Sequence, residues 1–178
     1  MRSLILCLLL LLVRATTLPA QYDDGLVRLA VPARFEGPQL ERNAPGWKIV
    51  GFVRDIPGTQ RGTVLQVTTV DLDEAGLSLP DSGEVHPTEA LLAEYLASVE
   101  RRRDNYREGS RGRMELSGLP AARAEWRGIG GGRGMHGVLY CVIVGSRVVL
   151  LHAQTFDDAP AEDLAAAVQA IESVVLQP

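Results

Sequence analysis

Residues 136–156 read HGVLYCVIVGSRVVLLHAQTF, and this stretch decides the fold. Two long apolar runs, residues 136–144 and 147–156, are separated only by Gly145 and Ser146. A glycine-led link of two residues between such runs is typical of a β-hairpin, because its turn follows the twist of the paired strands. We therefore predict two long antiparallel strands here.

The chain just before this hairpin also has strand character. Residues 121–129 alternate apolar side chains such as Trp126 with charged ones such as Arg123 and Glu125, so this strand should be solvated on one face. The glycine-rich residues 128–134 lead into another strand and not into the helix N-terminus that a phosphate cradle needs. We predict a hairpin loop there, with a mobile binding loop as the alternative.

The first part of the chain contains further strands. Alternating or β-branched residues predict strands at residues 25–35, 47–54 and 63–72. Residues 36–46 have the composition of a turn region, and residues 71–87 have that of a loop.

Two segments have the apolar spacing of amphipathic helices. The first should begin near Pro87 and stop at Gly109, and its apolar face consists of Leu92, Tyr95, Leu96 and Val99. The second should follow a cap at Asp157 or Asp158, and its apolar face consists of Leu164, Val168, Ile171 and Val175. The order of elements predicts a single α+β domain over residues 21–178, with an antiparallel β-sheet of about six strands flanked by two main helices.

The N-terminus has the features of a cleavable signal peptide over residues 1–20. Arg2 precedes an apolar run of ten residues, 4–13, which is shorter than the roughly 20 residues that span a bilayer. Cleavage could follow Ala15 or Ala20, and an uncleaved N-terminal anchor is the alternative. Cys7 lies too early for a lipid anchor. We expect a soluble secreted or periplasmic protein without a transmembrane segment after cleavage.

Composition limits the classes of partner and of redox chemistry. Loss of Arg2 and Arg14 with the signal peptide removes two positive charges from a formal net charge of −4 and gives −6. An acidic domain is a poor candidate for nucleic-acid binding, which depends on releasing counterions from phosphates. Cys141 would be the one remaining cysteine, so we expect no internal disulfide and a buried, inert thiol. A nucleophile or an intermolecular disulfide is the alternative for this residue.

Four arginines form the most basic feature of the chain: Arg101, Arg102, Arg103 and Arg107. In the last turns of a helix, cations complement the negative end of the helix dipole, so a solvated helix end is the simpler interpretation. A patch that binds an anion or a partner is the alternative.

The other candidate groups do not form a recognisable catalytic or metal-binding motif. His86, His136 and His152 lack a second ligand at metal spacing, and His86 is expected at the surface. His152 is expected to be a packed residue, with a catalytic base at His152 or His136 as the alternative. Ser146 lies in the predicted hairpin and lacks the sharp turn of a serine nucleophile. An acidic loop, Asp71, Asp73 and Glu74, is expected to be solvated, or to bind a cation weakly. No cofactor is indicated.

Several short segments resemble one family. They are residues 31–35 (VPARF), 116–126 (LSGLPAARAEW), 156–160 (FDDAP) and 171–175 (IESVV). Together they resemble the PsbP-like superfamily, which includes DcrB-like exported bacterial proteins, over about residues 25–177. The resemblance implies an α/β/α sandwich and a mostly non-catalytic accessory or binding role, in some members as chaperones or assembly factors. It carries over no catalytic residues.

These observations lead to three functional hypotheses. The first is an exported, non-catalytic accessory protein that binds another protein or a small amphiphile. The second is a small secreted enzyme, a hydrolase that uses His152 or His136. The third is a structural component of the cell envelope.

Overall fold

The computed structural model describes residues 20–56, 62–80, 83 and 85–177. The predicted signal peptide lies outside the described residues except for its last residue, Ala20. None of the helices in the described part of the chain is long and apolar enough to cross a membrane.

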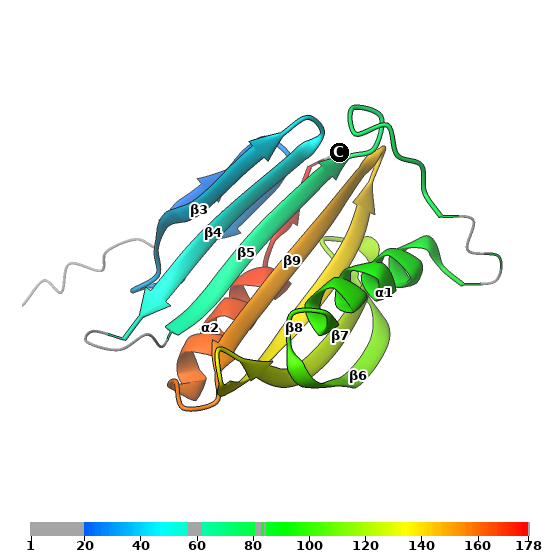
Figure 1. Ribbon diagram of the computed structural model, residues 1–178. Helices are drawn as coiled ribbons and strands as arrows, with labels where there is room; N and C mark the ends of the chain where they lie inside the picture. The colour runs from blue at the N-terminus through cyan, green and yellow to red at the C-terminus, as the bar shows by residue number, and fades with distance from the viewer. Residues whose placement is uncertain (1–19, 57–61, 81–82, 84, 178) are drawn as a thin grey trace, which may run out of the picture.

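A seven-stranded antiparallel sheet forms the middle layer of the molecule (Figure 1). Its strands are β3 (Glu36–Ala44), β4 (Trp47–Asp55), β5 (Gly62–Asp71), β6 (Asp104–Leu116), β7 (Leu119–Gly130), β8 (Arg133–Val144) and β9 (Arg147–Phe156). Their spatial order is β3-β4-β5-β9-β8-β7-β6. The predicted hairpin is confirmed as β8 and β9, in which Val144 pairs with Arg147 across a turn whose Gly145 has a φ of 60°. The α+β class and the antiparallel sheet are likewise confirmed.

A second, small sheet of three strands covers part of one face. It contains β1 (Gln21–Asp23), β2 (Val27–Ala30) and β10 (Val175–Leu176), in the order β1-β2-β10. The predicted first strand, residues 25–35, was therefore too long. The hydrogen bond from the Phe35 N–H to the Pro32 carbonyl already belongs to a turn.

The prediction of about six strands was wrong because residues 36–46 are not a turn region. Most of them form β3, an edge strand that pairs with β4 from Glu36↔Val53 to Ala44↔Trp47. Its described side chains are exposed, so the strand has no apolar alternation that could reveal it. Pro38 is tolerated because an edge strand has one side without ladder hydrogen bonds.

The predicted end of the first helix at Gly109 was also wrong. Helix α1 (Pro87–Glu100) ends nine residues earlier, with Arg101 as its C-cap. The following residues belong to β6, whose backbone pairs along β7 from Asp104↔Ile129 to Leu116↔Leu119. Most of the side chains of β6 are exposed, so only this pairing distinguishes the strand from a solvated continuation of the helix. The predicted start near Pro87 is confirmed, and it is fixed by a capping box between His86 and Glu89.

The two helices lie on opposite faces of the sheet, which gives the three-layer α/β/α arrangement (Figure 1). Helix α1 buries Leu92, Leu96 and Val99 against Trp126 and Leu139 of the sheet. Helix α2 (Ala161–Glu172) and the small sheet cover the other face, with its core residues Ala167, Ala170 and Ile171.

The start and the end of α2 differ from the prediction. The helix begins after Pro160 without a side-chain cap, and Asp157 instead hydrogen-bonds His136. Val175, predicted on the apolar helix face, lies beyond the helix in β10 and is 45% exposed.

Coverage of the α1 face is uneven. Helix α1 packs mainly on β7 and β8, at one half of the sheet. Figure 1 shows it crossing in front of these strands, whereas β4 and β5 have no described helix in front of them. In the described part of the chain, the α1 face of β4 and β5 is therefore not covered by a helix.

The last two residues of the predicted apolar face of α2, Ile171 and Val175, should differ in their effect on stability. Ile171 is fully buried, so Ile171→Ala should lower the free energy of unfolding by about 2–5 kcal/mol. Val175→Ala, at an exposed position of β10, should change it by no more than about 0.5 kcal/mol. Urea unfolding followed by circular dichroism measures both values. Equal losses in the two variants would contradict the assignment of Val175 to the surface.

Candidate functional site

Two neighbouring cavities open on the uncovered part of the α1 face. The first, of about 290 Å³, is here called the apolar groove, and its apolar lining includes Trp47, Val70, Leu72, Leu77, Leu91 and Leu150. The second, of about 240 Å³, is here called the arginine pocket, and its polar lining includes Arg42, Gln66, Arg102, Arg103, His152 and Gln154. Tyr95 of α1 lines both cavities.

Sheet geometry explains why these side chains meet. Alternate residues of a strand point to the same face, and directly paired residues share that face. Trp47 pairs with Val70 between β4 and β5, and so both project toward α1. On β9, Leu150 and His152 are two residues apart, so they lie side by side on this face, one in each cavity.

The loop after β5 forms one wall of the apolar groove. The Leu72 N–H donates to the Ser146 carbonyl at 3.0 Å, and the Leu77 N–H donates to the Leu72 carbonyl at 2.8 Å, so the loop is tied to the sheet and to itself. Trp47 is nevertheless 41% exposed and Leu77 49% exposed. The loop thus contributes Leu77 to the groove and leaves both this side chain and Trp47 of β4 exposed.

One guanidinium of the arginine pocket, that of Arg103, is held in place by contacts with neighbouring residues. Arg103 lies over the ring of Trp126, 5.5 Å from its centroid, and donates from Nη2 to Gln154 Oε1 at 3.2 Å. Its Nη1 donates to the carbonyl of Arg102 at 2.9 Å. Its Nε is buried and has no hydrogen-bond partner among the described residues.

The pocket is positively charged. Its lining contains three guanidinium groups and, among the described residues, no carboxylate. Burial and the charge of Arg102 lower the pKa of Arg103. Burial, followed by the charges of Arg103 and Arg102, lowers the pKa of His152 to about 3. The site therefore concentrates positive charge in a protein whose formal net charge is −4.

A short polar ridge separates the two cavities. Gln66 Nε2 donates to the Tyr95 hydroxyl at 3.1 Å and to Thr68 Oγ1 at 2.9 Å. The Tyr95 ring stands edge-on to His152, with 6.2 Å between the ring centroids. Because Tyr95 lines both cavities, the two lie next to each other across this ridge.

The structure divides the four arginines that the sequence singled out. Arg102 and Arg103 line the arginine pocket, whereas Arg101 is the C-cap of α1 and Arg107 lies on β6. The interpretation as a basic last helical turn was wrong, because the helix ends at Glu100 with no basic residue in that turn. Arg42 was missed because it lies in β3, which has no apolar pattern to identify it as a strand of this sheet.

The structure separates the two histidines that were considered as a catalytic base. His152 is buried, and its Nε2 accepts a hydrogen bond from Trp126 Nε1 at 3.0 Å, so the ring is a neutral packing residue, as the simpler interpretation had it. His136 Nδ1 and Asp157 Oδ1 are 2.6 Å apart. Among the described residues, no hydroxyl or thiol forms a hydrogen bond with the His136 ring.

The thiol of Cys141 and the carboxylate of Asp71, two further candidate groups, have structural roles. Cys141 is buried, and burial raises the pKa of its thiol to about 12. Asp71 accepts from the Glu74 N–H at 3.1 Å and from Arg147 Nε at 3.2 Å. In the described part of the chain, no three His, Cys, Asp or Glu side chains are grouped to hold a metal ion.

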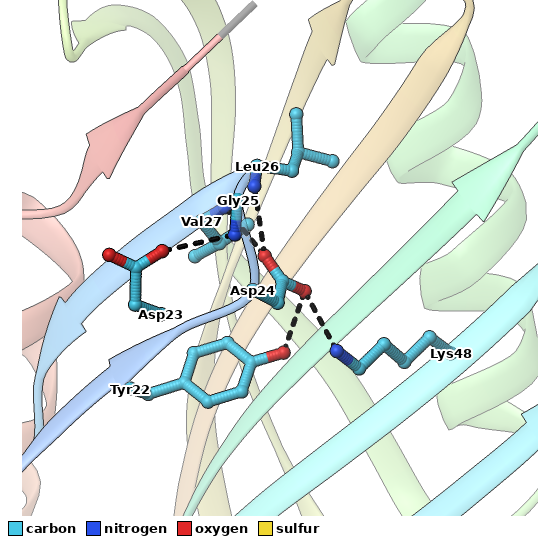
Figure 2. Close-up of polar contacts among 7 residues, drawn as sticks. All are labelled: Tyr22, Asp23, Asp24, Gly25, Leu26, Val27 and Lys48. Atoms are coloured by element: carbon cyan, nitrogen blue, oxygen red, sulfur yellow. Dashed lines mark hydrogen bonds and ion pairs between the residues drawn. The ribbon is translucent and has the colours of Figure 1, made fainter.

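A polar cluster on the opposite face of the sheet is structural (Figure 2). The Asp24 carboxylate accepts from the N–H groups of Leu26 and Val27, from the Tyr22 hydroxyl at 2.7 Å and from Lys48 Nζ at 3.1 Å. Burial opposes its ionisation, but these hydrogen bonds together lower its pKa. The carboxylate links the β1–β2 turn to β4 of the main sheet.

Comparisons with solved structures identify the fold. A protein of unknown function from Pseudomonas aeruginosa, PA94, is 15% identical with a TM-score of 0.56, covering 89% of this chain and 97% of that one. LpqN of Mycobacterium tuberculosis, involved in cell envelope biogenesis, is 15% identical with a TM-score of 0.55, covering 90% of each chain. PsbP of the cyanobacterium Synechocystis is 14% identical with a TM-score of 0.61, covering 89% of this chain and 92% of that one.

At these identities the likeness concerns the fold alone, and it confirms the PsbP-like fold that the sequence resemblance implied. No protein-family model matches the chain, and no curated protein matches it.

Replacement of Asp24 should make stability less dependent on pH. Asp24→Asn keeps the shape of the side chain but loses its charge, and should lower the free energy of unfolding by about 1–3 kcal/mol at pH 7. Because the pKa of Asp24 is lowered in the folded state, its stabilisation is present above the unfolded pKa of about 3.9 and is lost as the pH falls toward the folded pKa.

Urea unfolding of both proteins between pH 7 and pH 2 measures this effect. The difference between them should shrink at the acid end. A constant difference across this range would show that the carboxylate charge does not contribute.

Proposed function

We propose that this protein is an exported, non-catalytic accessory protein that holds a small amphiphile in the apolar groove. One observation carries the proposal: apolar side chains are held open to solvent beside a polar pocket. Apolar walls with a few convergent polar groups are the usual composition of a small-molecule site.

The size of the site supports a small ligand. The groove and the pocket measure about 290 and 240 Å³, which together fall within the range of about 300–1,000 Å³ that ligand sites occupy. An alkyl chain in the groove gains about 0.8 kcal/mol for each methylene removed from water. A chain lying in the groove would also cover part of Trp47 and Leu77, which line it.

The chemistry of the described residues supports binding over catalysis. Of the two histidines of the hydrolase hypothesis, His152 is held neutral and buried by Trp126, and His136 pairs with Asp157 alone. The thiol of Cys141 lies in the core. A role as a structural envelope component has no feature of its own in the described residues, whereas the groove gives binding a location.

Export is the remaining part of the proposal. Residues 1–20 have the composition of a signal peptide, and one protein of the same fold, LpqN, is involved in cell envelope biogenesis. Detection of the mature chain outside the cytoplasm, beginning at residue 16 or 21, would support this part, and retention of residues 1–20 would contradict it.

Substitutions in the wall of the groove should weaken binding of an uncharged apolar probe. N-phenyl-1-naphthylamine becomes fluorescent in an apolar site, and its titration measures the dissociation constant. The double variant Trp47→Ser/Leu77→Ser should raise this constant about tenfold, because it removes two exposed apolar side chains that contribute roughly 1 kcal/mol or more.

Val175→Ser is the matched control, since Val175 is equally exposed but lies in the small sheet. It should leave the dissociation constant unchanged. An unchanged constant in the double variant, or an equal rise in the control, would contradict binding in the groove.

A further inference from the structure

We propose that the bound molecule is a single-chain amphiphile with a carboxylate head, whose head lies in the arginine pocket and whose tail lies in the apolar groove. The inference rests on the proposed function and adds the charge and the direction of the ligand. It follows from the position of the two cavities and from the charges around one of them.

The spacing of the cavities fits one continuous molecule. Leu150 in the groove and His152 in the pocket are two residues apart on β9, which separates their side chains by about 7 Å along the strand. Tyr95 contributes to both walls. A head group bound among the arginines would therefore place the first methylenes of its chain at the ridge and the following ones in the groove.

The charge of the pocket selects an anion. Arg42, Arg102 and Arg103 approach it from β3, from the end of α1 and from the residue that follows. None of the three forms an ion pair with a carboxylate of the described residues. Glu94 is the acidic side chain of the lining, and it belongs to the groove and is exposed. Electrostatic complementarity thus favours a negative head and disfavours a positive one.

The guanidinium of Arg103 is poised for such a head. Its Nη atoms hydrogen-bond Gln154 and the Arg102 carbonyl, while its buried Nε has no partner among the described residues. The guanidinium is therefore held in a fixed orientation at the wall of the pocket, and a carboxylate matches the planar geometry of guanidinium donors. Burial and, after it, the like charge of Arg102 lower the pKa of Arg103, and an anion beside the two guanidinium groups would offset this repulsion.

The arrangement of the two cavities argues for a small head on a flexible chain. The lining of the arginine pocket comes from α1, the turn after it, β3, β4, β5 and β9, and the apolar groove lies next to it across the Gln66–Tyr95 ridge. Inorganic phosphate would satisfy the arginines but would leave the groove exposed. Only a molecule with both parts uses both cavities.

A set of three ligands with the same alkyl chain tests the inference. Decanoate, decanol and decylammonium differ in head charge, and isothermal titration calorimetry below their micelle concentrations measures their affinities. Hydrogen bonds to a charged group contribute enough for decanoate to bind about tenfold or more tightly than decanol. Decylammonium should bind more weakly than decanol.

Removal of two pocket charges should abolish this preference. Arg42→Gln/Arg102→Gln should lower decanoate affinity at least about tenfold and leave decanol affinity unchanged, because both side chains are peripheral to the core. Arg101→Gln is the matched control: it removes a charge from the adjacent residue, which lines neither cavity, and decanoate affinity should be retained.

Other outcomes overturn specific parts. Equal binding of decanoate and decanol would overturn the anionic head and leave the groove proposal standing. No binding of any of the three would overturn both. Inorganic phosphate binding as tightly as decanoate would overturn the role of the tail. An unchanged decanoate affinity in the Trp47→Ser/Leu77→Ser variant would overturn it as well.

Discussion

The pairing of β8 with β9 is the constraint on which the rest of the structure depends. The two strands run antiparallel from Val144↔Arg147 to Met135↔Phe156, and most of their side chains are buried on both faces. A strand pair that is apolar on both sides must be covered on both sides. Helix α1 supplies one cover, and α2 with the small sheet supplies the other.

The candidate site arises because one of these covers is incomplete. Helix α1 lies over β7 and β8, while β4 and β5 extend the sheet beyond it on the same face. The loop after β5 covers part of this extension but leaves Trp47 and Leu77 exposed. The end of α1 brings two arginines to the other end of the opening, where β3 contributes a third. The part of this sheet face that α1 does not cover therefore contains an apolar region and a cationic region.

Contacts among Trp126, His152 and Arg103 connect this site to the core. Trp126 donates to His152, and its ring lies under the Arg103 guanidinium. His152 stays neutral there, because burial and the nearby arginines lower its pKa to about 3. The position of Arg103 thus depends on the packing of a tryptophan on β7, and a cation over an aromatic face is held in a defined place. These contacts explain why His152, in the middle of β9, is a packing residue in this protein.

The sequence by itself determined the elements whose apolar pattern records their burial. The β8–β9 hairpin, the start of α1 near Pro87 and the burial of Cys141 all follow from residues that face a core, and the PsbP-like fold was evident from short turn and core segments. Strand β3 and the first part of β6 were missed because most of their described side chains face solvent, so that only backbone pairing with β4 and β7 defines them. The arginine cluster was visible as composition, but tertiary structure decided that Arg102 and Arg103 meet Arg42, some 60 residues away in the chain, and that Arg107 does not belong with them. Such a site depends on which strands become neighbours and on how far a helix covers them, and neither property is encoded in a local pattern of residues.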